Sequence, residues 1–451
     1  MTAAPGWHNQ PAVSRLSAVT DHVTPYDRFC HDDAEVERLL LAGEQRAVLE
    51  AYFGAREYRE LTQLAAVAAR CPADESLPHV LIVPGILGSQ LGVRRRAPLP
   101  DDVLWLDPLD IQGGRLALLD PEAGAPIVPL GVVLYSHLKL KLRLRAAGFP
   151  ASLHDYDWRL DIASLGETLA ARLRAHAARP AAIVAHSMGG LVSRVALGLE
   201  GTAHVHRVIL LGTPNQGAFS PLQALRGTYS VVRNIARLDL GRSALELAEH
   251  VFGGFPSLYQ MLPRTTSEGL DLAEPRHWPS QGPAPRKPLL ARARRFHAAL
   301  PVTDERFIAI AGVGRNTVTA AARQEDGFLY TVTRGGDGTV PTSSAAPHGM
   351  QAYYTRAAHS ELTRDAQVAA AIIDVLKLGA TRRLPARWVS RAHARATISD
   401  RQLVRLPAGK LDWARLTPLQ RQTFLDNLNE PPPLQLRLAA RAAISNEKPR
   451  P

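Results

Sequence analysis

A serine occupies a position in this chain where a strand is expected to turn sharply into a helix. Ser187 lies in the segment AHSMGG at 185–190, after the apolar run at 181–184 and before a helical pattern. The small neighbours permit a strained turn that exposes the serine hydroxyl, as in the G-x-S-x-G nucleophile elbow. Ala185 stands in the first glycine position, where one methyl group is the smallest possible addition. The segment predicts a nucleophilic serine, with an ordinary strand-to-helix turn as the alternative.

A serine hydroxyl is a weak nucleophile, so it requires a base within hydrogen-bond reach and a carboxylate that holds this base in the right tautomer. Where a serine stands in a nucleophile elbow of this kind, the order along the chain is serine, acid, histidine. Asp337 fits the acid, because the glycines of the segment RGGDGTVP at 334–341 permit a tight loop. It is preferred over Asp304, Asp326 and Asp365, and its own alternative is an Asp-Gly turn with backbone bonds only.

The base is predicted to be His359, which follows a short strand at Tyr353–Tyr354 and precedes the last long helical pattern. His348 is the competitor, but it precedes that strand and its ring would have to reach across it. His186 is adjacent to the serine, so its ring is expected to point elsewhere and to pack in the elbow. The three predicted residues then follow the order of a serine-hydrolase triad.

A tetrahedral intermediate on the serine carries an oxyanion that requires two preorganised amide donors. The amide of Met188 is expected to be one donor, because this residue directly follows the serine. The second donor is expected in the glycine-flanked turn PGILGS at 84–89, with the Ile86 amide preferred. The alternative for this turn is the plain end of a strand.

The composition is that of a soluble globular protein. Of 451 residues, 46% are hydrophobic and 21% are charged. No apolar run reaches the ~18 residues of a membrane span, and the first ten residues lack the pattern of a signal peptide, so a cytoplasmic location is predicted. Cys30 and Cys71 exclude a disulfide framework, and a pair of free thiols is preferred over a single bridge. We expect no metal ion and no cofactor.

Positive charge is concentrated at the end of the chain. The net charge is +11, and the segment Thr381–Pro451 contains 14 Lys and Arg against 5 Asp and Glu, a net +9. A solvated arginine-rich surface is the preferred interpretation of this segment, and peripheral contact with anionic membranes is the alternative. Its aromatic residues are Trp388, Trp413 and Phe424, too few for a surface that stacks bases, so no nucleic acid is expected.

Strand and helix patterns alternate through the middle of the chain. Strands are predicted at 80–83, 151–156, 181–184, 207–211, 307–311, 328–332 and 353–354, and helices at 132–147, 165–178, after 187 and at 362–378. This alternation predicts an α/β fold with a mostly parallel central sheet and flanking helices. The roughly 90 residues before 307 are too many for a plain loop and are predicted to form a cap over the site.

Three regions are therefore predicted. Residues 1–78 form an N-terminal helical extension, with a helical pattern from about 31 to 70 that has one break. Residues 79–378 form the catalytic region, with the cap inserted at about 215–305. Residues 379–451 form a basic C-terminal extension.

Several motifs occur in an order that resembles the lecithin:cholesterol acyltransferase family of α/β-hydrolases. In chain order they are PGILGS (84–89), LWLDP (104–108), YDWR (156–159), AHSMGG (185–190), FPSLYQMLP (255–263) and GDGTVP (336–341). The match spans roughly 79–378 and leaves out both extensions. The resemblance implies the α/β-hydrolase fold, a triad of Ser187, Asp337 and His359, and oxyanion donors at Ile86 and Met188.

The resemblance also implies acyl-ester chemistry on lipids, in which an acyl chain passes from a phospholipid or similar ester to the serine and then to water or an alcohol. Leu87 and Trp105 are expected at the substrate-binding surface, where the Trp105 segment and the cap form a mobile roof. Asp157 and Arg159 are expected as a buried charge pair that shapes the site. The chain departs from the family at Ala185 and in lacking a signal peptide and a lid disulfide, so lipid specificity does not carry over.

The leading hypothesis is a serine hydrolase for acyl esters that forms an acyl-enzyme on Ser187. This class includes esterases, lipases, phospholipases and O-acyltransferases. Two alternatives stay open. One is a hydrolase-like scaffold that contacts membranes or nucleic acid through the basic extension, against which the predicted triad argues. The other is a polyester depolymerase, which would share the triad and differ in the cap.

Overall fold

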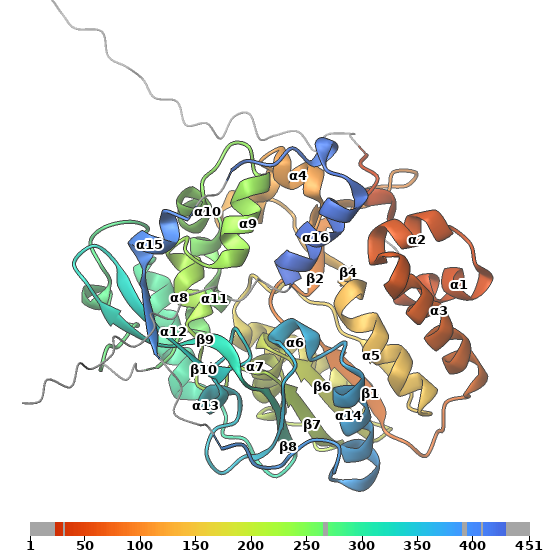
Figure 1. Ribbon diagram of the computed structural model, residues 1–451. Coiled ribbons are helices and arrows are strands. Elements are labelled where there is room, and N and C mark those ends of the chain that lie inside the picture. The colour runs from red at the N-terminus through yellow and green to blue at the C-terminus, as the bar shows by residue number, and fades with distance from the viewer. Residues whose placement is uncertain (1–22, 30–31, 265–268, 390–394, 407–408, 430–451) are drawn as a thin grey trace, which may run out of the picture.

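The computed structural model describes residues 23–29, 32–264, 269–389, 395–406 and 409–429. A central sheet of six parallel strands has the spatial order β11-β8-β7-β6-β1-β5 (Figure 1). The strands are β1 (His79–Val83), β5 (Ala151–Leu153), β6 (Ala181–His186), β7 (Val205–Leu211), β8 (Phe307–Gly312) and β11 (Gln351–Thr355). Most are short and apolar, as expected for strands buried on both faces.

Helices cover both faces of this sheet, because alternate residues of a strand point to opposite faces. The covering helices are α5 (Leu134–Ala146), α6 (Ile162–Ala175), α7 (Met188–Leu197) and α14 (Ala366–Leu378). Val80 and Ile82 of β1 belong to a core shared with α5 and α14, whereas Leu81 and Val83 belong to a core shared with α6 and α7. This arrangement is the α/β-hydrolase fold, so the predicted fold class is confirmed.

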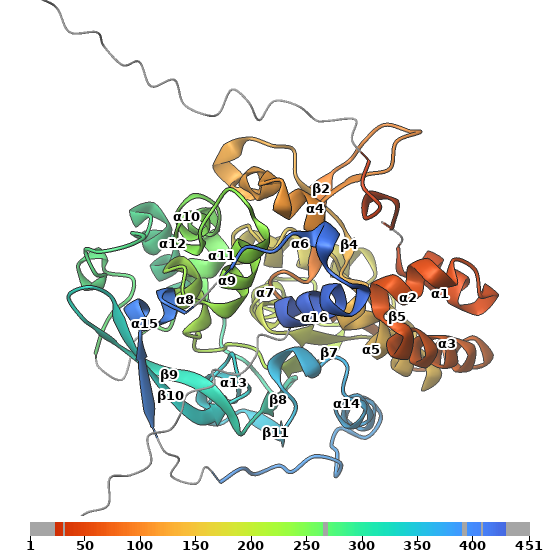
Figure 2. The same ribbon diagram turned by 45° about the horizontal axis from the view of Figure 1, so that its top comes forward.

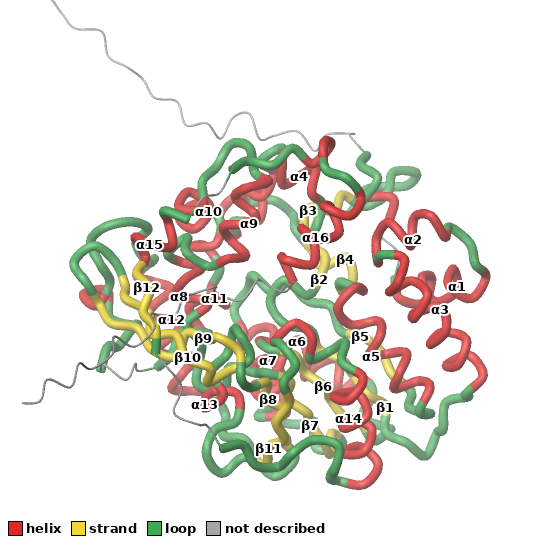
Figure 3. The backbone as a smooth tube through the Cα atoms, viewed as in Figure 1, coloured by secondary structure: helices red, strands yellow, loops and turns green. Residues whose placement is uncertain are grey.

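Two small antiparallel sheets accompany the central one. Of their strands, the sequence patterns predict only the one at 328–332, which pairs in an antiparallel sheet and not in the central sheet. One has the order β3-β2-β4 and the other β12-β10-β9. Their strands are β2 (Ser89–Val93), β3 (Asp102–Trp105), β4 (Val128–Val132), β9 (Arg315–Arg323), β10 (Phe328–Gly336) and β12 (Ala396–Ser399). Figure 3 shows the second sheet in yellow beside the central one. β9 is made largely of Ala, Thr and Arg, so it lacks the apolar run that marks the central strands.

The N-terminal extension is predicted as helix with one break, and the structure contains two breaks. The helices are α1 (Asp33–Ala42), α2 (Arg46–Phe53) and α3 (Ala55–Arg70). Gly43 (φ 70°) ends the first helix and Gly54 (φ 84°) separates the other two, because glycine adopts positive φ values easily. The helices pack on α5, where the Lys139 ammonium donates to Glu57 (2.6 Å) and Glu60 (2.8 Å).

Within the described residues, five helices occupy the region predicted as the cap. They are α8 (Ser220–Leu225), α9 (Ser230–Leu238), α10 (Ala244–His250), α11 (Pro256–Gln260) and α12 (Lys287–Ala299). They gather on the left of Figure 1, beside the central sheet, and α9 also contacts α4 (Pro108–Gln112). A further short helix, α13 (Thr342–Ala345), follows β10.

The described part of the C-terminal extension packs on the rest of the molecule. β12 pairs with β10, and α15 (Asp400–Val404) buries the Asp400 carboxylate against the Arg226 guanidinium at 3.0 Å. α16 (Pro418–Asn429) lies between α9 and α2 in both Figure 1 and Figure 2. The membrane contact that is the alternative for this extension stays a prediction.

Within the described ranges, no helix combines the length and the apolarity that crossing a membrane requires. Cys71 is a free thiol, whereas Cys30 lies outside the described residues. The expected pair of free thiols and the expected cellular location therefore stay predictions.

Candidate active site

The turn between β6 and α7 holds Ser187 in a conformation that few residues adopt. Its φ is 52° and its ψ is −125°, a strained combination for a residue with a side chain. Small neighbours make the turn possible. A Cβ atom on Gly189 would lie 2.3 Å from the Pro84 carbonyl oxygen, and one on Gly190 would lie 2.0 Å from the Thr213 hydroxyl oxygen. The serine therefore stands at the apex of a sharp strand-to-helix turn.

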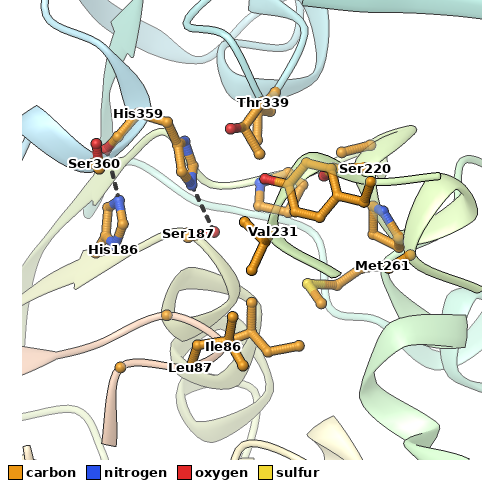
Figure 4. A pocket seen from close by; sticks show the side chains of 18 of the residues that line it. Ile86, Leu87, His186, Ser187, Ser220, Val231, Met261, Thr339, His359 and Ser360 are labelled. Atoms are coloured by element: carbon orange, nitrogen blue, oxygen red, sulfur yellow. Dashed lines mark hydrogen bonds between the residues drawn. The ribbon is translucent and has the colours of Figure 1, made fainter. Parts of the chain in front are cut away.

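Two loops bring a histidine and a carboxylate to this serine. His359 follows β11, and its Nε2 lies 3.0 Å from Ser187 Oγ (Figure 4). Its Nδ1 lies 2.8 Å from Oδ2 of Asp337, which follows β10. The Oδ1 atom of the same carboxylate accepts hydrogen bonds from the backbone amides of Thr339 (2.9 Å) and Val340 (2.7 Å). Because Asp337 Oδ2 accepts a hydrogen bond from Nδ1–H of His359, the histidine can keep Nε2 as an acceptor for the serine hydroxyl.

The competing residues considered in the sequence have other positions. Asp304 forms an ion pair with Arg306 at 2.7 Å, and Asp365 caps the N-terminus of α14. Asp326 is exposed beyond β9. His348 lies in the turn that precedes β11. The residues preferred from the sequence are the ones that the structure brings together.

The order of the strands explains why the serine lies in a crevice. β1 lies between β5 and β6, and the chain passes from β1 to β5 before it returns to β6. The loops at the carboxyl ends of β1 and β6 therefore diverge, which is where open parallel sheets usually bind ligands. Gly85 follows β1 and lies so close to the elbow that a Cβ atom there would be 2.8 Å from Cβ of Ser187.

Three backbone amides in the loops next to Ser187 are available to a ligand. The amides of Ile86, Leu87 and Met188 donate no hydrogen bond within the part of the chain that the structure describes. Leu87 has a φ of 64°, which is strained for a leucine. The indole Nε1 of Trp105 donates to the Leu87 carbonyl oxygen at 3.0 Å and so supports this conformation. Unpaired, rigidly held amides beside the serine are what an oxyanion hole requires.

Trp105, Asp157 and Arg159 are buried and are not among the residues that line the cavity beside Ser187. The Trp105 side chain is 3% exposed and packs edge-on against Trp158, with ring centroids 5.7 Å apart. Asp157 and Arg159 form a buried ion pair at 2.6 Å, as the resemblance implies. The hydrogen bond to the Leu87 carbonyl oxygen leaves the indole N–H of the buried Trp105 ring with a partner. Leu87, in contrast, lines the cavity.

The serine and the histidine line the same cavity, whose empty space, including the part open to solvent, is about 1060 Å³. Figure 4 shows Val231 and Met261 on one side of Ser187, with His186 and Ser360 on the other. The apolar lining residues from the cap are Pro221, Ala224, Val231, Val232, Phe252, Leu258 and Met261. Among the described residues, no Lys, Arg, Asp or Glu side chain lines this cavity. It therefore suits a ligand that is uncharged and largely apolar where it is enclosed.

The sequence patterns miss several of these lining residues. Tyr229 and Val231 come from the cap, His137 comes from α5, and Leu428 comes from α16. Burial raises the pKa of Tyr229 to about 12, so its hydroxyl stays protonated. No motif surrounds these residues, and their common position arises from tertiary packing alone.

Two buried histidines near the triad are held neutral. The rings of His186 and His359 lie 4.7 Å apart, and the His186 Nε2–H donates to the His359 carbonyl oxygen at 3.0 Å. Burial, reinforced by His359 and His137, holds the pKa of His186 well below its usual range. Burial also lowers the pKa of His137 to about 4. The ring of His186 thus packs beside the base, away from the serine hydroxyl.

Replacing His137 with leucine is expected to make the protein less sensitive to acid. Below pH 6.5 the unfolded chain protonates this histidine, whereas the folded chain, with a pKa of about 4, does not. The free energy of unfolding therefore falls as the pH drops from 6.5 toward 4, by about 2 kcal/mol at pH 5 from this group. Urea unfolding at pH 7.5 and pH 5.0 measures this effect. Between the two pH values, the free energy of unfolding of His137→Leu should fall by about 2 kcal/mol less than that of the wild type.

The matched control is His250→Leu, which changes an exposed histidine at the end of α10. This variant should lose as much stability between the two pH values as the wild type. Equal drops in the wild type and in His137→Leu would contradict the assignment of acid sensitivity to His137.

Gly212, directly after β7, packs against the back of the histidine and the carboxylate. Its φ is 57°, and a Cβ atom there would lie 2.9 Å from Asp337 Oδ2 and 3.0 Å from His359 Nδ1. Gly212→Ala is expected to displace this pair and to lower kcat for a soluble ester about 100-fold. Gly314→Ala is the control, because Gly314 has a φ of 80° with nothing within 4 Å of its Cβ position. An equal loss in both variants would point to backbone strain instead of displacement.

Comparisons with known proteins find one family model and several solved structures that are similar to parts of this chain. A family model described as a PGAP1-like alpha/beta domain matches residues 170–250, which contain the Ser187 elbow. The chain is similar to the crystal structure of Bacillus licheniformis lipase BlEst2 in its propeptide form, with 15% identity over 71% of this chain and 53% of that chain and a TM-score of 0.39. It is also similar to the mature form of the same lipase, with 15% identity over 68% of this chain and 94% of that chain and a TM-score of 0.36. The crystal structure of the Tle4–Tli4 complex is similar at 15% identity over 70% of this chain and 100% of that chain, with a TM-score of 0.41.

The similarity covers 53% of the propeptide form, so the chain spans about half the length of that protein. A search of the curated proteins finds no match.

Proposed function

We propose that this protein is a serine hydrolase that cleaves acyl esters through an acyl-enzyme on Ser187. The observation that carries the proposal is the chain of hydrogen bonds from Ser187 Oγ to His359 Nε2 (3.0 Å) and from His359 Nδ1 to Asp337 Oδ2 (2.8 Å). Serine, base and acid in this geometry are the groups that acyl transfer requires.

In the first half of the reaction, His359 Nε2 takes the proton of the Ser187 hydroxyl while Oγ attacks the carbonyl carbon of the ester. The carbonyl oxygen becomes an oxyanion, which the amides of Met188 and Ile86 stabilise. The alcohol then leaves with the proton from His359, and the acyl group stays on Ser187. Asp337 stabilises the charged imidazole during these steps.

In the second half, a water molecule or an alcohol gives its proton to His359 Nε2 and attacks the acyl-enzyme. The carboxylic acid or the new ester leaves, and the proton returns to Ser187 Oγ. Hydrolysis and acyl transfer therefore use the same residues and differ in the acceptor. The motif order that resembles the lecithin:cholesterol acyltransferase family is the reason to test an alcohol acceptor.

The cavity supports a lipid-like ester as the substrate. Most of its lining in the cap is apolar, and it holds no charged lining side chain among the described residues. An acyl chain is uncharged and apolar, so it matches this lining. A charged phospholipid headgroup finds no counter-ion among these lining residues, which favours a neutral ester at the enclosed end of the cavity.

The function is tested with p-nitrophenyl butyrate, p-nitrophenyl dodecanoate and a long-chain phospholipid, each with and without a long-chain alcohol. Release of p-nitrophenol by the wild type, together with recovery of the free acid, would support an ester hydrolase. Recovery of the acyl group on the alcohol would support an acyltransferase. Absence of turnover with every ester, in protein shown to be folded, would contradict the proposal and favour a scaffold without chemistry.

A further inference from the structure

One wall of the cavity comes from the far end of the chain. Leu428, on α16, lines the same cavity as Ser187 and is 5% exposed. α16 contacts α9 of the cap and α2 of the N-terminal extension. Figure 2 shows α16 lying between these two helices. A helix that belongs neither to the central sheet nor to the cap thus contributes to the candidate substrate cavity.

Polar contacts hold the segment that precedes α16 on the molecule. The Leu411 amide donates to the Arg237 carbonyl oxygen at 2.7 Å. The Trp413 amide donates to Oε1 of Gln112, at the end of α4, at 2.8 Å. The Lys410 ammonium donates to backbone carbonyl oxygens of α9 and the loop that follows it. This segment is therefore anchored to both α9 and α4 before α16 begins.

Apolar contacts then seat α16 itself. Phe424 is 5% exposed and packs edge-to-face on Trp413, with ring centroids 5.8 Å apart. Phe424 and Leu428 belong to the same apolar core as Val231 and Val232 of α9, two residues that line the cavity. Leu428 therefore belongs to the apolar side of the cavity, the side that matches an acyl chain.

We propose that Leu428 is a specificity-determining residue that limits the length of the acyl chain accepted at Ser187. The inference rests on the proposed ester-cleaving function. A side chain in a close-packed wall excludes the volume that it fills, so removing its branch adds room for substrate methylene groups. Each methylene group that becomes buried favours binding about fourfold. The residue at position 428 should therefore change the preference between long and short esters.

Two substitutions test the proposal in opposite directions. The readout is the ratio of kcat/KM for p-nitrophenyl dodecanoate to kcat/KM for p-nitrophenyl butyrate. Leu428→Ala should raise this ratio about fourfold or more, and Leu428→Trp should lower it by a similar factor. Leu419→Ala, on the same helix but 77% exposed, should leave the ratio unchanged.

The proposal is overturned if Leu428→Ala and Leu428→Trp give the same ratio, or if Leu419→Ala shifts the ratio as much as Leu428→Ala does. Leu428→Met is a control for a change in the ratio that detachment of α16 would cause, because methionine has a volume similar to that of leucine and should keep α16 in place. It should keep the wild-type ratio, and a ratio as high as that of Leu428→Ala would contradict a role for volume. Failure of the proposed function would look different, since the wild type would then turn over neither ester.

Discussion

Replacing Ser187 with alanine is expected to lower kcat for ester turnover by roughly 10⁵-fold or more while the protein stays folded. The alanine lacks the oxygen atom that lies 3.0 Å from His359 Nε2, so no acyl-enzyme can form. The elbow itself should persist. Its shape depends on the close contacts of Gly189 and Gly190 with their neighbours, and these contacts do not involve the serine oxygen.

The measurement is kcat for p-nitrophenyl butyrate together with the Tm of each variant. Ser220→Ala is the matched control, because Ser220 also lines the cavity but lies on α8, away from the histidine (Figure 4). This control should keep most of its activity. Near wild-type turnover by Ser187→Ala would show that the nucleophile is elsewhere.

Asp337→Asn is expected to lower kcat about 10⁴-fold with little change in Tm. The carboxylate accepts hydrogen bonds at both oxygens, from the Thr339 and Val340 amides at Oδ1 and from His359 at Oδ2. An asparagine has one accepting and one donating end. If its oxygen keeps the two amides, its NH₂ group faces His359 Nδ1 and favours the tautomer that carries the proton on Nε2. That tautomer cannot accept the serine proton.

The test compares kcat of Asp337→Asn with that of Asp304→Asn, which changes an acid of the surface ion pair with Arg306. The surface variant should match the wild type. An Asp337→Asn variant that also matched the wild type would show that the histidine needs no carboxylate, which is incompatible with the proposed triad.

The part of the fold that sequence predicts best is the part with strong local patterns. The apolar run at 181–184, the small residues of the elbow and the helical pattern after it lie within about twenty residues, so β6, Ser187 and α7 follow from local sequence. His359 is predictable because it follows β11, and parallel strands bring their carboxyl ends to one edge of the sheet. Asp337 follows β10 of the antiparallel sheet, and it is predictable from its glycine-rich loop and its place between the serine and the histidine along the chain. The strand ends thus place residues that are far apart in sequence.

Other features depend on contacts that no local pattern records. β12 pairs with β10, across more than sixty residues of chain, and β9 has little apolar character. Trp105 is expected in a roof over the site but lies in the core, where its indole N–H donates to the carbonyl oxygen of Leu87. Leu428 reaches the cavity because the segment before α16 is anchored to α9 and α4. Each of these outcomes is decided by a partner from a distant part of the chain.

The most direct test of the account is reaction of the protein with a fluorophosphonate, followed by intact-mass measurement and peptide mapping. Serine attack on phosphorus forms the Oγ–P bond and releases fluoride, so the reagent reports a serine activated by its base. The account predicts one adduct per chain, located on Ser187, and a much slower reaction of Asp337→Asn. An adduct on a different residue, or no adduct on folded protein, would contradict the claim that Ser187, His359 and Asp337 form a catalytic triad.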